Sequence, residues 1–299
     1  MPKPTSKPKK NGHAKPNGHG WKETTAPFTS SDLAWLRNVR LFVATPMYSM
    51  GCTGEFRMAS LILNTTLIKY GITHTYSQRA DSLVPRARNW LADRFLAQDF
   101  THFLAWDADV VMSPEDVVRM LVLSRRHDGI LCGPYAKKTI NWERIAKAAR
   151  DRKHTWPIED MPAVGTNFVL NFIPSGTAKQ STISLAEPQE ILEGGTGWML
   201  IPRHVFTDMI DQQKVQSWRL MPEEIPDYGN KVHAYAFFQA LVDPTTEYYL
   251  SEDWYFCRLW RSMGGKVWAC LWMKSQHIGH YAYPANLPVL SRASGGVLE

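Results

Sequence analysis

Two acidic side chains stand one residue apart directly behind an apolar run. The run is Phe-Leu-Ala-Trp at residues 103–106, and Asp107 and Asp109 follow it. A short apolar and aromatic run is typical of a buried strand, so we expect both carboxylates at the end of a strand. Two such charges repel each other, and removing them from water costs free energy unless a cation binds between them. Carboxylate oxygens are suitable ligands for hard divalent ions. The pattern therefore predicts that Asp107 and Asp109 bind Mn²⁺ or Mg²⁺.

Strand and helix patterns alternate along the first half of the chain. We expect strands at residues 39–44, 72–76, 103–106 and 130–132, and helices at 55–70, from 85 onward and from 114 to about 128. Pro85 suits the first position of a helix, and Ser113 followed by Pro-Glu-Asp is a helix start. This order predicts an α/β fold with a mostly parallel sheet flanked by helices. Ligands bind beyond the carboxyl ends of such strands, where a loop at Thr45 and Pro46 would face the two acids.

The second half of the chain gives weaker patterns. We expect a helix at residues 141–153, a strand at 199–201, helices at 202–210 and 252–263, and a strand at 266–272. His277 lies just beyond that last strand. Because the sequence contains neither an internal repeat nor a clear linker, it predicts a single domain over residues 31–299.

The first 30 residues differ from the rest in composition. They are rich in Lys, Pro, Gly and Asn, and residues 1–22 carry six lysines and no acid, which equals the whole net charge of +6. Such a segment buries too little apolar surface to fold, so we expect a disordered basic tail. It is either a solubilising arm or a tether to a polyanion such as nucleic acid or anionic lipid.

The expected cellular location of the protein follows from features that the sequence lacks. It contains no apolar core of a signal peptide and no apolar stretch long enough for a transmembrane segment. The four cysteines are widely spaced and form no C-x-x-C pair, which argues against a zinc site. We therefore expect a cytoplasmic protein with reduced thiols.

Two common nucleotide sites are excluded by their missing glycines. The chain has no G-x-x-x-x-G-K-[ST] loop for a nucleoside triphosphate. The first strand is followed by Thr45-Pro46-Met47-Tyr48 and not by the G-x-G-x-x-G of a dinucleotide site. Two other interpretations of the acid pair stay open. One is a phosphohydrolase in which Asp107 is the nucleophile and Asp109 the acid/base, and the other is a pair of acids on a surface loop.

The sequence resembles the GT-A glycosyltransferases, metal-dependent enzymes that use nucleotide-sugar donors. The resemblance spans about residues 38–283. Its hallmark is the apolar strand followed by Asp107-Ala108-Asp109, the family's Asp-x-Asp motif. It also includes residues that the family places near the donor nucleotide or its diphosphate: Thr45, Pro46, Tyr48, Arg86, Arg88 and Asn89. Cations and amides at a helix N-terminus suit an anionic diphosphate.

Three later segments extend the resemblance. Gly195-Thr196-Gly197 lies in a Gly-rich strand that borders the donor sugar and the acceptor. Glu252 and Asp253 begin a helix, as the acidic motif of the family does, although acids there can also be simple capping groups. The last match is the late metal-binding histidine, His277 with His280 as the second choice. Apart from the resemblance, Lys138 follows the strand expected at residues 130–132, and we expect it at a phosphate or at the acceptor.

The resemblance implies a GT-A-type, Rossmann-like domain with a nucleotide-binding half at residues 31–140 and an acceptor-binding half at 141–299. It implies transfer of a sugar from a UDP- or GDP-sugar to a saccharide or other hydroxyl acceptor, with a modified base in nucleic acid as a second choice. Asp253, or Glu252 next to it, would be the general base of an inverting reaction. The rivals are the phosphohydrolase and a non-catalytic protein that binds a polyanion through its tail.

Overall fold

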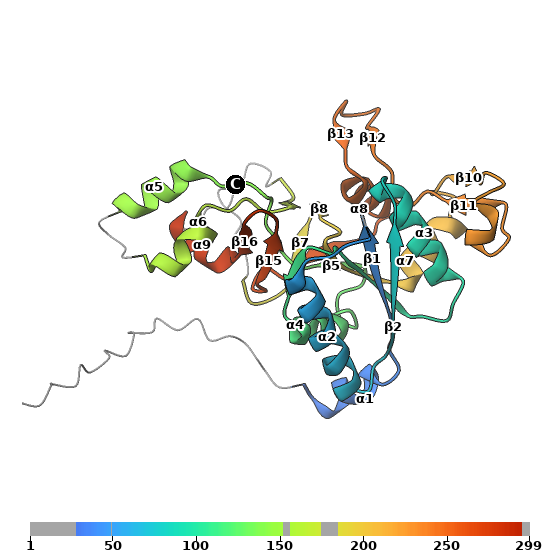
Figure 1. Ribbon diagram of the computed structural model, residues 1–299, viewed down its shortest axis with the longest axis horizontal. Helices are drawn as coiled ribbons and strands as arrows, with labels where there is room; N and C mark the ends of the chain where they lie inside the picture. Colours follow the sequence, from blue (N-terminus) through green and yellow to red (C-terminus); the bar gives the residue numbers. More distant parts are fainter. Residues whose placement is uncertain (1–27, 49, 152–155, 175–184, 295–299) are drawn as a thin grey trace, which may run out of the picture.

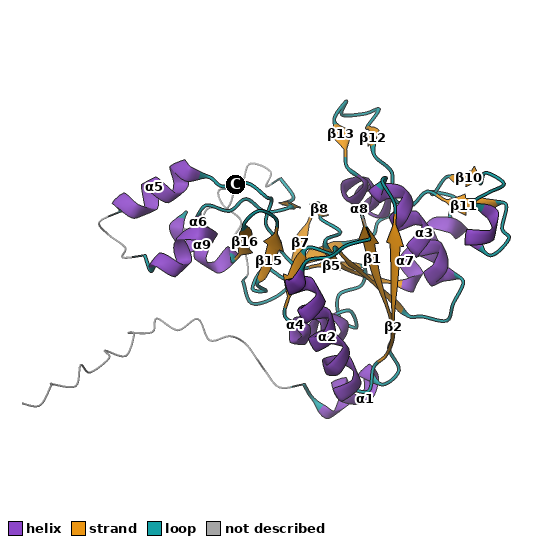
Figure 2. Ribbon diagram, viewed as in Figure 1, coloured by secondary structure: helices purple, strands orange, loops and turns teal. Residues whose placement is uncertain are grey.

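The computed structural model describes residues 28–48, 50–151, 156–174 and 185–294. It is a mixed α/β structure built around one large sheet, with helices packed on both faces (Figures 1 and 2). Residues 1–27 of the predicted N-terminal tail lie outside the described residues, whereas its end needs correction, because Thr29 caps a helix that begins at Ser30. Within the described residues, none of the helices combines the length and apolarity that crossing a bilayer requires.

The large sheet has seven strands among the described residues, in the order β2-β1-β3-β9-β5-β14-β7. The strands are β1 (Arg40–Met47), β2 (Thr73–Ala80), β3 (His102–Trp106), β5 (Ile130–Cys132), β7 (Gln189–Ile191), β9 (Trp198–Pro202) and β14 (Val267–Ala269). β1 pairs in parallel with β2 and β3, and β5 with β14, whereas β9 runs antiparallel to β3 and β5, and β7 antiparallel to β14.

The sheet is therefore mixed, and the prediction of a mostly parallel sheet needs correction. Five strands point one way, but β9 enters between β3 and β5 in the opposite direction, so half of the strand pairings are antiparallel. The βα alternation of the first half of the chain could not show this insertion, because β9 comes from the second half. The two halves expected at residues 31–140 and 141–299 thus share one sheet.

Helices cover the sheet in two groups. α1 (Ser30–Leu36), α2 (Gly54–Lys69) and α4 (Pro114–Leu123) pack on one face, and α3 (Val84–Leu96), α7 (Arg203–Asp211) and α8 (Glu252–Ser262) on the other (Figure 2). In β1, Leu41 and Val43 join the first core and Phe42 and Ala44 the second. This alternation follows from the two-residue period of a strand.

Shorter elements surround the large sheet. They are the sheet of β4 (Val110–Met112), β15 (Ser275–Ile278) and β16 (Ala282–Ala285), the pairs β6 (Leu170–Asn171) with β8 (Glu193–Gly194), β10 (Ser217–Arg219) with β11 (His233–Tyr235) and β12 (Leu241–Val242) with β13 (Tyr249–Leu250), the helices α5 (Trp142–Arg150), α6 (Met161–Val164) and α9 (Leu287–Ala293), and the 3₁₀ turns Ile158–Asp160 and Ile225–Tyr228. The pairing of β15 with β4 sets His277 opposite Val110, next to the acid pair.

Several element ends differ from the sequence prediction: β2 continues to Ala80 and does not end at residue 76, and β14 covers only Val267–Ala269 of the predicted 266–272. β1 continues through Thr45 and Pro46 to Met47, so these residues form strand and not loop. β3 pairs with β1 only as far as Ala44, which leaves the last residues of β1 paired with β2 alone. A proline is tolerated there because one side of the strand needs no N–H donor.

The end of α4 also differs from the prediction. The helix stops at Leu123, five residues before the predicted end near Asp128. The Ser124 hydroxyl donates to the Leu121 carbonyl at 2.7 Å, and the amides of the next residues bond back to carbonyls of the last helical turn. Gly129, with φ of +108°, then redirects the chain into β5.

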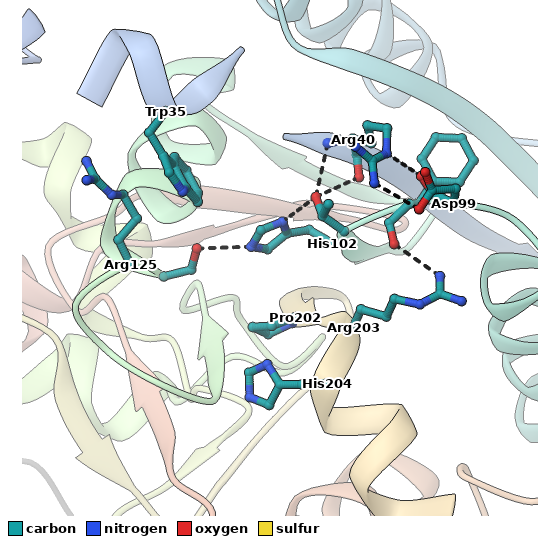
Figure 3. Close-up of a pocket in the computed structure, with 11 residues that line it drawn as sticks. Trp35, Arg40, Asp99, His102, Arg125, Pro202, Arg203 and His204 are labelled. Atoms are coloured by element: carbon teal, nitrogen blue, oxygen red, sulfur yellow. Dashed lines mark hydrogen bonds and ion pairs between the residues drawn. The ribbon is translucent and has the colours of Figure 1, made fainter. Parts of the chain in front are cut away.

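A cavity of about 510 Å³ lies at the opposite edge of the sheet from the acid pair, around the starts of β1 and β3 (Figure 3). Arg203 forms part of its wall. Its guanidinium donates to the carbonyl oxygens of Phe95, Leu96, Gln98 and Phe100 at 2.7–3.3 Å. These carbonyls belong to the C-terminal turn of α3 and the residues after it, where a cation also meets the negative end of the helix. Arg203 therefore has a structural role.

Replacing Arg203 by methionine should destabilise the fold by about 1–3 kcal/mol, because several carbonyl oxygens lose their donor. Urea unfolding monitored by circular dichroism measures the change. Arg57→Met, at an exposed position of α2, is the matched control and should shift the midpoint little. A midpoint for Arg203→Met equal to that of the control would contradict this role.

Candidate active site

Asp107 and Asp109 lie in a tight turn between β3 and β4, as predicted from the apolar run. The Asp107 carbonyl accepts a hydrogen bond from the Val110 amide at 3.1 Å, and the Asp107 amide donates to the Gly197 carbonyl at 3.1 Å. The Asp109 carbonyl accepts from the Ile278 amide at 2.7 Å. Hydrogen bonds thus fix the backbone of Asp107 against the start of β9 and the backbone of Asp109 against β15. The two carboxylates have different partners.

Asp107 is paired with a buried arginine. Arg88, in the first turns of α3, donates from Nη2 to Asp107 at 2.7 Å and from Nε to Glu252 at 3.3 Å. Its side chain is 5% exposed. Burial alone would lower the pKa of Arg88, but the charges of Asp107 and Glu252 outweigh that cost and raise it. Arg88 therefore stays charged and joins the acid after β3 to the acid that begins α8.

Asp109 has a more exposed partner. Lys138 donates from Nζ to one oxygen of Asp109 at 2.6 Å, and Nε2 of His277 lies 3.3 Å from the other oxygen. Burial raises the pKa of the Asp109 carboxyl, but the hydrogen bonds from His277 and Lys138 together outweigh burial, so the pKa lies below its ordinary value. Asp109 is therefore ionised at neutral pH.

The imidazole of His277 is oriented by its other nitrogen. Nδ1 lies 2.7 Å from the Ala136 carbonyl oxygen. A carbonyl only accepts, so Nδ1 carries a proton and Nε2 is the nitrogen that faces Asp109. A carboxylate oxygen and a ring nitrogen held this close need a proton or a cation between them. A backbone carbonyl on the far ring nitrogen is also the usual support of a metal-binding histidine.

Asp109 and His277 suit a divalent ion, but the predicted set of three ligands is not assembled. In the described part of the chain, no group of three or more His, Cys, Asp or Glu side chains is arranged to hold a metal. Asp107 is turned toward Arg88. The spacing of 3.3 Å between the His277 nitrogen and the Asp109 oxygen is close to that of two neighbouring ligands on one ion, about 3 Å for bonds of about 2.1 Å. An ion here would take its other ligands from water or from a bound phosphate.

Asp253 is the most perturbed carboxyl at this edge. It lies in the first turn of α8 with 8% exposure. Burial, and then the charge of Glu252, raise the pKa of Asp253 to about 6. Its Oδ1 accepts from the Ser251 hydroxyl and, at 2.8 Å, from the Trp254 amide. A carboxylate with a pKa near neutrality and one oxygen not used by these bonds is suited to accept a proton from a substrate.

The Gly-rich segment before β9 closes the site from one side. Because β9 is antiparallel to β3, Trp198 pairs with Trp106 and the glycines lie beside Asp107. The Gly197 amide donates to the Tyr135 hydroxyl at 3.2 Å. A Cβ on Gly195 would lie 2.1 Å from that hydroxyl oxygen, and one on Gly197 3.1 Å from an Asp107 oxygen. Only glycine lets this backbone approach so closely.

Replacing Gly195 by alanine should cost about 2–3 kcal/mol of stability, because the new methyl group overlaps the buried Tyr135 ring. Thermal melting measures the loss. Gly54→Ala is the matched control, since a Cβ on Gly54 meets nothing within 4 Å, and alanine early in α2 should be neutral or slightly stabilising. Equal melting temperatures for the two variants would contradict the packing described for Tyr135.

Some predicted donor-binding residues lie apart from this cluster. Arg86 pairs with Asp81 after β2, through two bonds of 2.7 and 2.9 Å. Asn89 is buried, and its amide group bonds to the backbone of Phe238 through both its nitrogen and its oxygen. Asn89 thus fastens α3 to the segment after β11, a structural role that its place in the sequence did not indicate.

The remaining predicted residues divide by exposure. Thr45 is 1% exposed in β1, while Tyr48 is 78% exposed just beyond that strand. Ala108 lies in the acid-pair turn, where its carbonyl accepts from the Thr53 amide at 3.3 Å. His280 is exposed, whereas Nε2 of His277 lies 3.3 Å from an Asp109 oxygen, so His277 is the better placed of the two histidines.

Sequence reasoning missed Tyr135 and the pairing of Lys138. Tyr135 is 5% exposed and touches both the Gly-rich segment and, edge to face, the His277 ring. Burial is the main reason why the pKa of the Tyr135 hydroxyl lies well above its ordinary value, so this hydroxyl stays neutral. Its only signal in the sequence is an aromatic residue just after a strand end. Lys138 was expected at a phosphate or at the acceptor, and the structure pairs it with Asp109.

Comparisons with known proteins add little to this geometry. No family model and no curated protein matches the chain. Among solved structures, the chain is similar to one described as the crystal structure of A197 from STIV, with 16% sequence identity and a TM-score of 0.44. The match covers 81% of this chain and 86% of that chain. A similarity this distant carries no argument about function, which rests on the site itself.

Proposed function

We propose that the protein transfers a sugar from a nucleoside diphosphate sugar to an acceptor hydroxyl, with the help of a divalent metal ion. The observation that carries the proposal is the convergence of side chains from distant parts of the chain at one edge of the sheet. The converging side chains are Arg88, Asp107, Asp109, Lys138, Glu252, Asp253 and His277. Each lies in a segment that resembles a GT-A glycosyltransferase motif, except Lys138, which lies in the segment that follows β5.

The proposed metal site consists of Asp109 and His277. Mn²⁺ or Mg²⁺ would bind there and, when bound, would stabilise the negative charge that grows on the departing diphosphate. His277 is already oriented by the Ala136 carbonyl, and Asp109 is held by Ile278. Asp107 takes a supporting role, because its carboxylate is held by Arg88.

Asp253 is the proposed general base. Its carboxylate accepts the proton of the acceptor hydroxyl while that oxygen forms a bond to the anomeric carbon. The bond from that carbon to the phosphate oxygen breaks, and the nucleoside diphosphate leaves with the electron pair. A base on the acceptor side leads to inversion at the anomeric carbon. The elevated pKa of Asp253, about 6, makes this carboxylate a stronger base than an ordinary aspartate, yet leaves it ionised at pH 7 to 8.

Arg88 positions the two acidic centres relative to each other. It bonds to Asp107 on the strand side and to Glu252, the neighbour of Asp253, on the helix side. Since a guanidinium is planar and rigid, these two bonds set the distance between the start of α8 and the end of β3. In this proposal Arg88 does not bind the donor diphosphate directly, because its side chain is buried and paired.

The GT-A type of the fold is part of the same proposal. It is supported by β9, a strand that carries the glycines beside the acid pair. The donor would be a UDP- or GDP-sugar and the acceptor a saccharide or another hydroxyl compound. The sequence adds two further expectations to this proposal. One is a nucleic acid acceptor bound through the basic tail, and the other is a cytoplasmic location.

One screen tests the proposal against its rivals. The protein is incubated with nucleoside diphosphate sugars, with Mn²⁺, Mg²⁺ or EDTA, and release of the nucleoside diphosphate is measured. The proposal expects release with a divalent ion and none with EDTA. An aspartyl-phosphate on Asp107 and hydrolysis of small phosphate esters would instead support the phosphohydrolase. No turnover of any donor with any ion would support the non-catalytic protein.

A further inference from the structure

The ion pair between Lys138 and Asp109 differs in kind from the one between Arg88 and Asp107. The Lys138 side chain is 39% exposed and that of Asp109 32%, whereas Arg88 is 5% exposed. Arg88 bonds to two carboxylates, and Lys138 bonds to one. A lysine on a flexible stem at an exposed pair contributes little net free energy and separates easily. The Lys138 pair is therefore the one that a competing cation can open.

Lys138 bonds to an Asp109 oxygen that a metal ion at this site would need as a ligand. Its ammonium lies 2.6 Å from one Asp109 oxygen, and the other oxygen faces His277. The stem of Lys138 runs past Gly279, where an added Cβ would lie 3.3 Å from the lysine Cδ. The stem of Lys138 thus lies beside the backbone of Gly279, two residues after His277.

We propose that Lys138 is an exchangeable counter-ion: a divalent cation displaces its ammonium from Asp109, and the freed ammonium then binds the phosphates of the nucleoside diphosphate. The inference rests on the proposed function, since it uses the same metal site. It makes metal and nucleotide binding cooperative, because each ligand favours the state in which Lys138 has left Asp109. It also makes the metal affinity of the free protein lower than its ligands alone would give.

Direct binding of Mn²⁺, followed by the electron paramagnetic resonance signal of the free ion, tests the first half of the inference. Lys138→Met removes the competitor but keeps an apolar stem beside Gly279, and should bind Mn²⁺ about fivefold more tightly than the unmodified chain. Lys137→Met is the matched control, since it removes the same charge from the exposed neighbouring residue. It should change Mn²⁺ affinity less than twofold.

Calorimetric titration with UDP and GDP tests the second half. Lys138→Met should weaken nucleotide binding several-fold when Mn²⁺ is present and leave it unchanged when Mn²⁺ is absent, because Lys138 is then bonded to Asp109. A loss of the same size in both conditions would overturn the exchange, because it would mean a lysine that is always free for the nucleotide.

A third variant separates failure of this inference from failure of the proposed function. If Asp109→Asn abolishes Mn²⁺ binding while Lys138→Met binds Mn²⁺ as the unmodified chain does, or more weakly, the counter-ion role is wrong and the metal site stands. If Asp109→Asn binds Mn²⁺ as tightly as the unmodified chain, the metal site itself is wrong, and the inference falls with it.

Discussion

Asp109→Asn is expected to reduce metal-dependent turnover of a nucleoside diphosphate sugar by at least about a hundredfold. Asparagine has nearly the same shape but no charge, so it is a far weaker ligand for Mn²⁺ or Mg²⁺. The pKa of Asp109 lies below its ordinary value because hydrogen bonds from His277 and Lys138 outweigh burial, and the wild-type carboxylate is therefore ionised at neutral pH. The measurement is the rate of nucleoside diphosphate release at saturating donor, with Mn²⁺ varied.

The same variant should fold normally, which separates loss of the metal from loss of the protein. Asp109 is 32% exposed and its lysine partner 39%, and exposed pairs of this kind contribute little to stability. We expect a melting temperature close to that of the unmodified chain. Asp99→Asn, an exposed acid at the opposite edge of the sheet, is the activity control. Unchanged turnover in Asp109→Asn would refute the assignment of this residue to the metal.

Asp253→Asn is expected to lower kcat by about 10²–10⁴-fold, the usual contribution of a general base. Donor affinity should stay nearly the same, since Asp253 acts on the acceptor. The pKa of Asp253 is raised to about 6, so activity of the unmodified chain should rise with pH through about 6 and then level off. In the variant that pH dependence should disappear. Loss of donor binding in place of kcat would move Asp253 into the donor site.

The stability of Asp253→Asn should change in the opposite direction from its activity. Burial raises the pKa of Asp253 from an ordinary value of 3.8 to about 6, so the folded state binds this proton more tightly than the unfolded state does. Ionisation of Asp253 therefore costs stability as pH rises from about 4 to about 6, and the full cost of about 2–3 kcal/mol persists above that range. Asparagine carries no charge and avoids this cost.

Unfolding by urea at two pH values measures this effect. Asp253→Asn should be more stable than the unmodified chain at pH 8 and nearly equal to it at pH 4. Asp211→Asn, an exposed position at the end of α7, should show no such difference. If Asp253→Asn is less stable than the unmodified chain at pH 8, the Asp253 carboxylate stabilises the fold. That result would contradict the proposal that ionisation of this buried carboxyl costs stability.

Local patterns in the sequence predicted most elements that carry the site. The apolar run before Asp107 is β3, residues 130–132 are β5 as expected, and Pro85 stands in the first turn of α3. Such elements are predictable because hydrophobic periodicity and helix-end residues act over a few positions. The acid pair follows β3 for the same reason.

Strand pairing and side-chain partners were not predictable in this way. The antiparallel insertion of β9 depends on contacts between residues 106 and 198, far apart in the chain. Arg88 was expected at the diphosphate, and its burial between Asp107 and Glu252 depends on how α3 and α8 meet. The 3.3 Å approach of His277 to Asp109 likewise follows from the pairing of β15 with β4. No local pattern encodes these contacts.

The most direct measurement is a crystal structure of the protein with Mn²⁺ and a sugar nucleotide that it cannot turn over, with manganese located by its anomalous signal. The account predicts one manganese ion bonded to Asp109 and to Nε2 of His277, in contact with the diphosphate, and the Lys138 ammonium moved away from Asp109 onto a phosphate. Manganese and nucleotide bound elsewhere, with the Lys138 pair intact and Asp109 free of metal, would contradict it.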